Sequence, residues 1–222
     1  MTTFTLPDIL DGTKRFMTSA DQLPSPGWDD PVTRNLRREL LSEELEELFD
    51  ADDADDLTEV VDALLDITVV AHGSRLAYGA SDSMWIVGVV NRRFWDNPEA
   101  RQKLRRSIET SAHWYFDAED RGSRDDALIY LGNLIQHCAN ALDAFIGGEL
   151  ARACADEVTR SNLSKIVDGK VLRRGDGKIL KPTSYVAPDI AGVLENAGLT
   201  ETRSHDLLAG HGRSSNSEVS SA

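Results

Sequence analysis

Two groups of acidic residues are spaced so that together they could hold metal ions. The first is the run Glu43-Glu44-Leu45-Glu46-Glu47, and about a dozen residues later Glu59, Asp62 and Asp66 follow at i, i+3 and i+7. Residues with that second spacing share one face of an α-helix. If the two groups belong to neighbouring antiparallel helices, their carboxylates face each other. Carboxylate oxygens are the ligands that Mg²⁺ and Mn²⁺ prefer.

The first group lies within a helix that we expect over residues 36–49. At 100° per residue, the five leucines of this segment form one broad apolar stripe. Glu44 falls in the middle of the stripe and Glu47 inside its edge, whereas Glu43 and Glu46 fall outside it. Exposed acidic residues should avoid an apolar stripe, so Glu44 and Glu47 are the first candidates for a functional role.

The second group lies on a helix that we expect over residues 57–78. The first half of this helix is apolar nearly all round, which predicts a central position in the fold. Glu59, Asp62 and Asp66 would then lie against a core, although a solvated acidic face is an equal alternative for these three taken alone. The acidic run 50–56 is expected to be a solvated turn between the two helices.

Carboxylates that face each other need a compensating charge. Two of them about 5 Å apart repel by roughly 3 kcal/mol at an effective dielectric constant of 20. Raised pKa values would relieve this repulsion, and so would basic side chains. However, the sequence has no Lys or Arg between Arg38 and Arg75. Ligation by carboxylates alone favours Mg²⁺ or Mn²⁺ over zinc, which prefers nitrogen and sulfur.

The overall composition excludes some classes of function. The 222 residues carry a net charge of −14 and are 41% hydrophobic, enough for one substantial core or one core with an appendage. With no run of 18 apolar residues and no signal peptide, neither membrane insertion nor export is expected. The negative charge argues against nonspecific nucleic-acid binding. Cys138 and Cys154 lack metal-ligand spacing and are expected to be reduced packing residues.

Proline, glycine and turn residues divide the rest of the chain. An irregular loop over 23–31 precedes the first long helix, and either Asp30 or Thr33 is expected to cap that helix. Turn signals at 168–169 and 176–177 predict a small β-ribbon over 166–182. Beyond residue 203 the chain is rich in Ser, Gly and Asn and is expected to be disordered. Three further helices are expected over 84–95, 99–119 and 124–150.

The middle of the chain is similar to a second copy of the carboxylate hairpin. Residues 104–145 correspond to 36–78 at an offset of 67 beyond the turn, with one gap allowed so that Leu36 pairs with Leu104. Chance similarity of two amphipathic hairpins is the alternative. A true repeat predicts a four-helix bundle within one chain, with metal on one side only. The copy has lost the acids, since Glu44, Glu47 and Asp62 correspond to Ser111, Trp114 and Ile129.

These motifs resemble those of a known superfamily. Glu-Glu-x-x-Glu at 43–47 followed by Glu-x-x-Asp at 59–62 is similar to the all-α NTP pyrophosphohydrolases, which include MazG-like proteins, dimeric dUTPases and phosphoribosyl-ATP pyrophosphohydrolases. The segments 156–165, 176–182 and 185–189 resemble the C-terminal signature of phage MazG-like enzymes, and residues 16–24 resemble their opening segment more weakly. The resemblance implies an all-α, MazG-like four-helix-bundle core with a degenerate internal repeat and a small β-ribbon.

The resemblance also implies a domain organisation and a reaction. The helical core would span residues 1–160, a nucleotide- and phosphate-binding segment 161–200, and a disordered tail 201–222. The reaction would be hydrolysis between the α and β phosphorus atoms of a (d)NTP, giving a monophosphate and pyrophosphate, with two to three Mg²⁺ or Mn²⁺ ions.

The resemblance assigns the following residues to that reaction. The implied metal ligands are Glu44, Glu47, Glu59 and Asp62, with Asp66 either as a further ligand or as an acceptor behind the ligands. The candidates for accepting a proton from water are Glu43 and Glu47. The implied substrate contacts are Gln22, Arg160, Asn162, Lys165, Lys178, Lys181 and Tyr185.

The resemblance indicates the substrate, the cellular location and the oligomeric state less directly. A purine deoxynucleotide, dGTP first, is the expected substrate, because one similar phage branch converts dGTP to dGMP. We expect a cytoplasmic protein (host cytoplasm if phage-encoded), without membrane or direct nucleic-acid contact, as a monomeric pseudo-dimer or a homodimer. Two alternatives remain open: a metal-dependent nucleotide-binding regulator without turnover, and an acidic DNA mimic.

Overall fold

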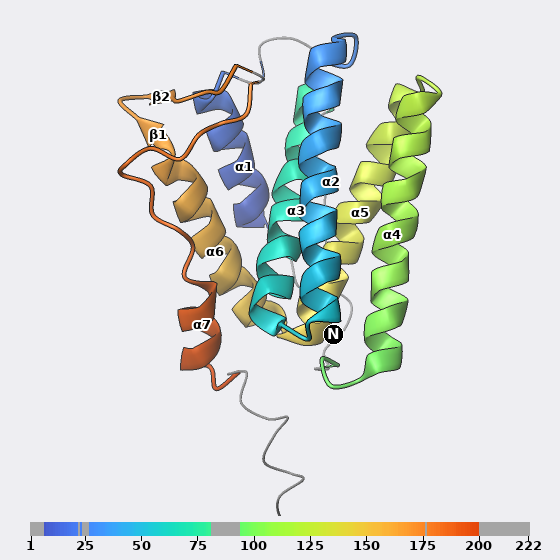
Figure 1. The fold of residues 1–222 in the computed structure, drawn as a ribbon, viewed down its shortest axis with the longest axis vertical. Coiled ribbons are helices and arrows are strands. Elements are labelled where there is room, and N and C mark those ends of the chain that lie inside the picture. Colours follow the sequence, from blue (N-terminus) through green and yellow to red (C-terminus); the bar gives the residue numbers. More distant parts are fainter. Residues whose placement is uncertain (1–6, 22, 24–26, 81–93, 176, 200–222) are drawn as a thin grey trace, which may run out of the picture.

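The computed structural model describes residues 7–21, 23, 27–80, 94–175 and 177–199 of the chain. Within these residues the fold is all-α, with seven helices and one two-stranded sheet (Figure 1). No helix in this part of the chain is long and apolar enough to cross a membrane. The elements are α1 (Pro7–Ser19), α2 (Pro31–Asp53), α3 (Leu57–Ala77), α4 (Pro98–Asp120), α5 (Arg124–Phe145), α6 (Gly148–Ser164), β1 (Ile166–Val167), β2 (Lys170–Val171) and α7 (Ile190–Asn196).

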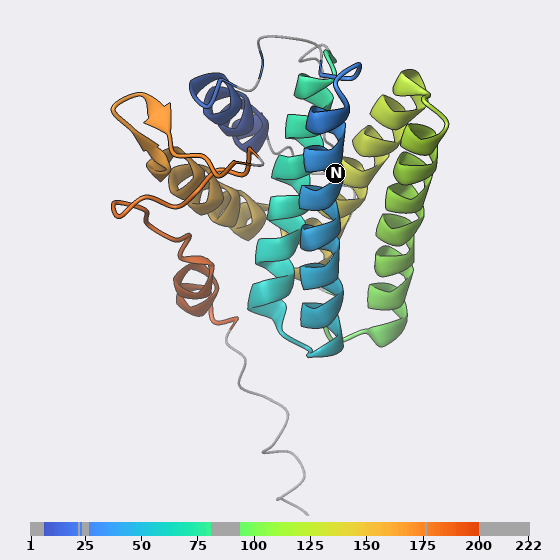
Figure 2. The ribbon, with the colours of Figure 1, turned by 45° about the horizontal axis from the view of Figure 1, so that its top comes forward.

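Two helical hairpins form the centre of the molecule. Helices α2 and α3 make one hairpin, α4 and α5 make the other, and the hairpins pack together through α3 and α5. Helices α1 and α6 cover α3 from the side opposite the second hairpin, and α7 packs on α6 and α3 (Figures 1 and 2). Helix α3 of the first hairpin is therefore covered by α5 on one side and by α1, α6 and α7 on the other. The first hairpin and the C-terminal part of the chain thus lie next to each other.

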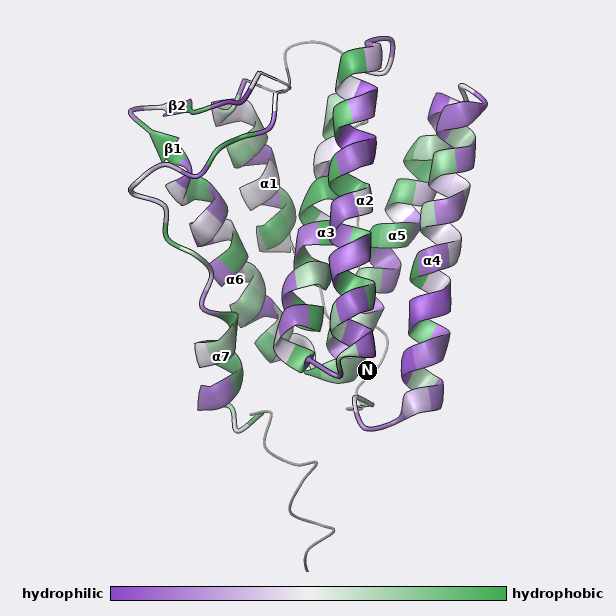
Figure 3. Ribbon diagram, in the orientation of Figure 1, coloured by the Kyte–Doolittle hydropathy of each residue, from purple (hydrophilic) through white to green (hydrophobic). Residues whose placement is uncertain are grey.

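The apolar pattern explains why α3 is central. Leu64, Leu65 and Ile67 are completely buried, and in Figure 3 hydrophilic residues dominate the visible faces of α2 and α4. Burial of such side chains contributes about 1.5–3 kcal/mol each. In the second hairpin, Leu131 and Leu134 are also completely buried. The expected packing role of the second hairpin is thus confirmed.

Proline and cap residues set where the long helices begin. The Asp30 side chain accepts hydrogen bonds from the backbone N–H groups of Val32 and Thr33, so of the two candidates it is Asp30 that caps α2. Pro31 fits the first position of this helix because its missing N–H would have no intrahelical partner. Asn97 and Pro98 repeat the arrangement at the start of α4.

The acidic turn is shorter than expected. Helix α2 continues to Asp53, so only residues 54–56 connect it to α3, and the prediction of a turn over 50–56 was wrong. Arg105 on α4 explains the difference, because its Nη1 lies 2.9 Å from Asp52 and 2.5 Å from Asp53. Cations from a distant part of the sequence therefore stabilise carboxylates in the last turn of α2.

Two helix predictions in the middle of the chain also need correction. The helix expected over 124–150 ends at Phe145, and α6 begins at Gly148. Gly147 separates them with φ = +83°, a backbone conformation that glycine adopts at little cost. For the helix expected over 84–95, residues 84–93 lie outside the described residues, and Phe94 and Trp95 are not helical. The expected tail beyond 200 also lies outside the described residues.

The expected β-ribbon is present. Strands β1 and β2 pair antiparallel through Ile166 with Val171 and Val167 with Lys170, and Arg173 bridges to Ile179 further along. Asp168 and Gly169 both have positive φ, as a two-residue type I′ turn requires. The ribbon returns the chain toward α1 and α2.

The second hairpin repeats the first at a constant offset of 67 positions. Helix α2 runs from Pro31 to Asp53 and α4 from Pro98 to Asp120, so no gap is needed. The proposed pairing of Leu36 with Leu104 was therefore one residue out of register. The buried apolar positions of α2 and α4 correspond as Leu41 to Ile108, Leu45 to Ala112, Leu48 to Tyr115 and Ala51 to Ala118.

The contacts between the hairpins are reciprocal. Arg38 of α2 binds Asp120 at the end of α4 at 2.7 Å, and Arg105 of α4 binds Asp53 at the end of α2 at 2.5 Å. The Arg38 guanidinium lies 4.9 Å from the Phe116 ring, and that of Arg105 lies 4.7 Å from the equivalent ring of α2. Exchange of partners between equivalent positions is what a two-fold axis produces.

The segments that lead into the two hairpins are equivalent too. Trp28 packs edge-on against Tyr78 with ring centroids 5.2 Å apart, and Trp95 packs edge-on against Phe145 at 5.3 Å. The N–H groups of Gly27 and Phe94 donate to the carbonyls of Ala77 and Ala144, each at 2.7 Å. The repeat therefore begins about ten residues earlier than the sequence comparison indicated.

Candidate functional site

A hollow of about 360 Å³ lies between α1, α2, α3, α6 and the C-terminal segment. We call it the carboxylate hollow. One wall carries acids from α2 and α3, and the other carries polar and basic residues from α6 and the chain beyond it. The predicted site residues that line it are Glu43, Glu44, Glu47, Asp62, Asp66, Asn162, Lys165, Lys178, Lys181 and Tyr185.

The acids of this hollow resist being charged together. Burial raises the pKa of Glu44 to about 8, with Asp66 and Glu47 as the next causes. Burial and the neighbouring Asp62 raise the pKa of Asp66 to about 7. The pKa of Asp62 rises to about 6, through burial first and then through Glu59 and Glu47. These carboxylates therefore need the compensating charge that their spacing in the sequence predicted.

The donor set of the hollow fits a hard divalent cation. Asp62 has one carboxylate oxygen that is buried and has no hydrogen-bond partner among the described residues, an arrangement that costs free energy unless another ligand binds there. All the acidic groups present oxygen ligands, as Mg²⁺ and Mn²⁺ prefer. As the side chains stand, no three His, Cys, Asp or Glu residues in the described part of the chain form a ready metal cluster.

Basic residues from the C-terminal half face these acids. The Lys165 ammonium donates to Asn162 Oδ1 at 2.8 Å and lies 5.8 Å from the centroid of the Tyr185 ring. The Lys181 ammonium lies 4.9 Å from the same centroid. After burial and the neighbouring acids, Lys165 and Lys181 act on Asp62 in the opposite direction and lower its pKa. These two ammonium groups therefore lie within electrostatic reach of the carboxylates.

Lys178 takes a different position on the rim. Its ammonium forms an ion pair with Glu43, which the helical stripe had placed outside the apolar face. Glu43 is exposed, in agreement with that expectation. Glu47 is exposed as well, but it makes no ion pair within the described part of the chain and lines the hollow.

Two of the predicted site residues that the structure describes are not brought into the hollow. Arg160 binds Glu157 and the carbonyl oxygen of Ala187, and so fastens the C-terminal segment to α6. Glu59 is exposed in the first turn of α3 and does not line the hollow. Gln22 lies outside the described residues.

One residue of the hollow was missed from sequence. Arg37 lines it although its side chain is buried, and burial lowers the pKa of this guanidinium to about 10. It donates to Met17 Sδ at 3.2 Å, which joins α2 to α1. The signal was present, because Arg37 lies one turn before Leu41 and thus within the leucine stripe of α2.

Comparison with known protein families matches the part of the chain that contains the first hairpin. Residues 13–84 match the family model of phosphoribosyl-ATP pyrophosphohydrolase. This segment contains α2, α3 and every acidic residue of the carboxylate hollow. Neither the curated proteins nor the solved structures gave a match. The family match supports the MazG-like all-α NTP pyrophosphohydrolase superfamily and a nucleotide pyrophosphohydrolase-type activity.

Proposed function

We propose that this protein hydrolyses a nucleoside triphosphate between the α and β phosphorus atoms, releasing a monophosphate and pyrophosphate. The observation that carries this proposal is the opposite charge of the two walls of the carboxylate hollow. Acids from α2 and α3 face lysines from the C-terminal segment that follows α6, beginning with Lys165, across one space. A complex of a divalent cation with a triphosphate presents positive charge to the acids and negative charge to the lysines, so it complements both walls.

Glu44, Glu47, Asp62 and Asp66 would hold two to three Mg²⁺ or Mn²⁺ ions in this hollow. These ions would neutralise the triphosphate and make a bound water more acidic. The unpartnered oxygen of Asp62 and the raised pKa values of Glu44 and Asp66 support this assignment. Glu59 would join only after its side chain turned toward the hollow.

The protein's own side chains would perform the remaining tasks. Lys165 and Lys181 would contact phosphate oxygens, because their ammonium groups are on the wall that faces the acids. Glu47 is a better candidate than Glu43 for accepting the proton of the attacking water, since Glu43 is already paired with Lys178. Asn162 offers both a donor and an acceptor to the nucleoside. Of the candidate substrates, we place purine deoxynucleotides, and dGTP in particular, first.

A substrate panel tests the reaction. The purified protein is incubated with the eight common NTPs and dNTPs and with phosphoribosyl-ATP, the substrate named by the matched family, each with Mg²⁺ or Mn²⁺. Chromatography then identifies the products. We expect pyrophosphate and a monophosphate from at least one nucleotide. Orthophosphate alone would place the cleavage at the β–γ bond and contradict the proposal.

A matched pair of variants tests the site. Glu47→Gln keeps the shape of a side chain that lines the hollow and removes its charge, so we expect turnover to fall by about 10³-fold. Glu46→Gln makes the same change one residue earlier, at an exposed position that does not line the hollow, and should stay active. Equal activities in the two variants would refute the assignment of Glu47.

A further inference from the structure

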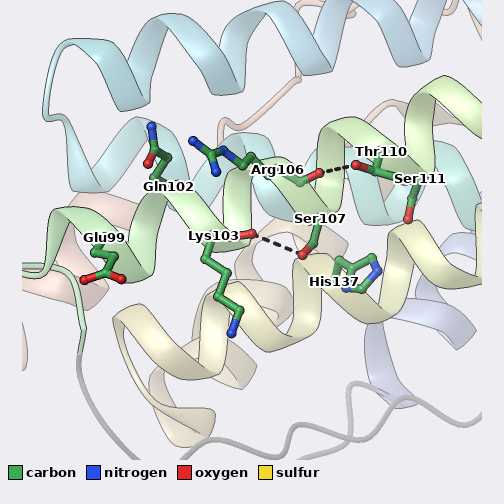
Figure 4. Close-up of a pocket in the computed structure, with 8 residues that line it drawn as sticks. All are labelled: Glu99, Gln102, Lys103, Arg106, Ser107, Thr110, Ser111 and His137. Atoms are coloured by element: carbon green, nitrogen blue, oxygen red, sulfur yellow. Dashed lines mark hydrogen bonds between the residues drawn. The ribbon is translucent and has the colours of Figure 1, made fainter.

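A second hollow, of about 510 Å³, lies on the opposite hairpin between α4 and α5 (Figure 4). We call it the basic hollow. Figure 4 shows Lys103 and His137 on the α5 side of α4, with Ser107 between them, and Arg106 on the other side of the helix. Its lining residues are Glu99, Gln102, Lys103, Arg106, Ser107, Thr110, Ser111 and His137.

The two hollows occupy equivalent places in the repeat. At the offset of 67 positions, Ser111 corresponds to Glu44 and His137 corresponds to Val70, and each of these residues lines its own hollow. The same is true of Lys103, Ser107 and Thr110, which correspond to Leu36, Leu40 and Glu43. The second hairpin has therefore kept the hollow while its chemistry has changed.

The charge at these positions is reversed. Where the first hairpin places carboxylates at 43 and 44, the second places the hydroxyls of Thr110 and Ser111. Where α2 has Leu36 and Glu39, α4 has Lys103 and Arg106. Among the described residues that line the basic hollow, Glu99 is the one carboxylate. Among the described residues only Glu99 and His137 could ligate a metal ion there, whereas an anion meets the ammonium group of Lys103 and the hydroxyls beside it.

These cations are not used elsewhere in the described part of the chain. Arg101, Arg105 and Arg121 lie on or next to α4 and each form ion pairs. Lys103 and Arg106 are exposed and form none among the described residues. In a protein with a net charge of −14, cations that form no ion pair with the described residues are available to a ligand.

Hydrogen-bond donors complete the hollow. The Ser111 side chain is buried, and its hydroxyl has no hydrogen-bond partner among the described residues. Burial lowers the pKa of His137, so its imidazole is neutral at pH 7 and still carries one N–H donor. Ser107 and Thr110 donate to backbone carbonyls of the preceding turn, and these hydroxyls can turn toward a ligand.

We propose that the basic hollow binds a phosphate group directly, without a metal ion. Lys103, on the α5 side of α4, supplies the nearest charge, and Ser111 and His137 supply directed donors. Arg106 adds positive charge from the other side of the helix. The ligand is an inorganic phosphate or pyrophosphate, or the phosphate chain of a nucleotide. This site does not depend on hydrolysis in the carboxylate hollow, whose acids would repel the same anion in the absence of a divalent cation.

Calorimetric titration of the full chain with pyrophosphate tests this proposal. EDTA is present throughout, so that no divalent cation can support binding in the carboxylate hollow. We expect one site per chain, with affinity reduced at least tenfold in Lys103→Gln and by a smaller factor in Arg106→Gln, because the Arg106 side chain is on the other side of α4. Lys170→Gln removes an exposed lysine of β2 that lines neither hollow and should bind as the unmodified protein does. Parallel titrations with orthophosphate and with a nucleoside triphosphate then distinguish a free anion from a nucleotide as the preferred source of the phosphate group.

Two outcomes would overturn the proposal. One is the absence of binding by the unmodified protein at millimolar pyrophosphate. The other is binding that persists in Lys103→Gln but is lost in Lys181→Met, since that would place the anion in the carboxylate hollow. Circular dichroism of each variant confirms that it is folded. Because Lys103 is exposed, its replacement leaves the core unchanged.

Discussion

The α2–α3 and α4–α5 hairpins have the same architecture and opposite surface chemistry. Helices α2 and α4 both have 23 residues, an acidic or amide cap and a proline at the first position. The first hairpin places Glu44, Asp62 and Asp66 around a hollow, while the second has Ser111, Ile129 and Asn133 at those positions. Packing and chemistry thus depend on different residues of one helical pattern, and either can change without the other.

Packing and chemistry can change separately because core residues point into the bundle, whereas residues around the hollows point toward solvent or a ligand. Leu41 and Ile108 are equivalent, buried and apolar, and exchanging either for a polar group would cost several kcal/mol. Ile129, in contrast, is 58% exposed at the position of Asp62, so its identity has little effect on the core. The core positions maintain the bundle, and the positions around the hollows determine what each half can bind.

The largest difference between the halves should appear in activity. Asp62→Asn removes a charge from the carboxylate hollow, and we expect the rate of nucleotide hydrolysis to fall by about 10³-fold. Ile129→Asn makes a polar residue at the equivalent exposed position and should leave the rate within about twofold. Steady-state assays with the best substrate of the panel measure both. Similar losses in the two variants would mean that the second half takes part in catalysis.

The core should respond equally in both halves. Leu64→Asp and Leu131→Asp each introduce an unpaired charge at a completely buried, equivalent position, and we expect each to lower the free energy of unfolding by about 4 kcal/mol or more. Urea denaturation followed by circular dichroism measures the loss. Asp125→Ala, in the exposed first turn of α5, is the control and should change stability by less than about 0.5 kcal/mol. A stable Leu131→Asp protein would show that the second hairpin is not part of the core.

The acids of the first half should make stability fall as pH rises. The folded pKa values of Glu44, Asp62 and Asp66 are raised to about 8, 6 and 7. Between about pH 4 and pH 8 the folded state then binds more protons than the unfolded state, so stability falls as pH rises, by on the order of a few kcal/mol. Melting temperatures without metal, measured across this range, test the sign.

Metal should reverse this trend. A divalent ion that binds only the folded protein adds about 2.7 kcal/mol at 100 times its dissociation constant, and it does so best when the acids are charged. The double variant Glu44→Gln/Asp62→Asn should melt higher than the unmodified protein in EDTA at pH 8 and respond weakly to Mg²⁺ or Mn²⁺. A pH-independent, metal-indifferent melting temperature in the unmodified protein would exclude the metal site.

The smallest effects should come from the reciprocal ion pairs. Arg105 binds Asp52 and Asp53 with 25% of its side chain exposed, and its replacement by Ala should cost about 1 kcal/mol. Arg38 and Asp120 are more exposed, so Arg38→Ala should cost about 0.5 kcal/mol. Because the two pairs lie at separate places, the double variant should show the sum of the two losses. A strongly non-additive result would contradict the view that the ion pairs of Arg38 and Arg105 act independently.

Local signals in the sequence predicted the first hairpin, and they predicted that its acids, Glu59 excepted, lie around one space. The leucine stripe of α2, the apolar α3 and the turn residues of the ribbon each depend on neighbours in the chain, so periodicity and turn chemistry reveal them. The same reasoning failed where residues distant in the sequence determine the end of a helix. Arg101 and Arg105 hold Asp52, and so extend α2 through an acidic run that reads as a turn.

The second wall of the site was less accessible to such reasoning. Lys178 reaches Glu43 across 135 positions, and only the resemblance in the C-terminal segment indicated that the two walls belong together. The gap placed in the repeat was an error of a different kind. The dipeptides at 28–29 and 95–96 are both Trp-Asp, at the offset of 67, and would have fixed the register without a gap.

The reciprocal contacts between the hairpins also have a consequence for assembly. Both partners of each contact belong to one polypeptide, so the bundle closes as a unimolecular step whose equilibrium does not depend on protein concentration. In a bundle built from two identical chains, every substitution enters both halves at once. Here each substitution enters one half alone. A tryptophan in place of an acid (Trp114 at the position of Glu47) or a lysine in place of a leucine (Lys103 at the position of Leu36) therefore changes the stability and chemistry of one half only. The two halves can then become different sites.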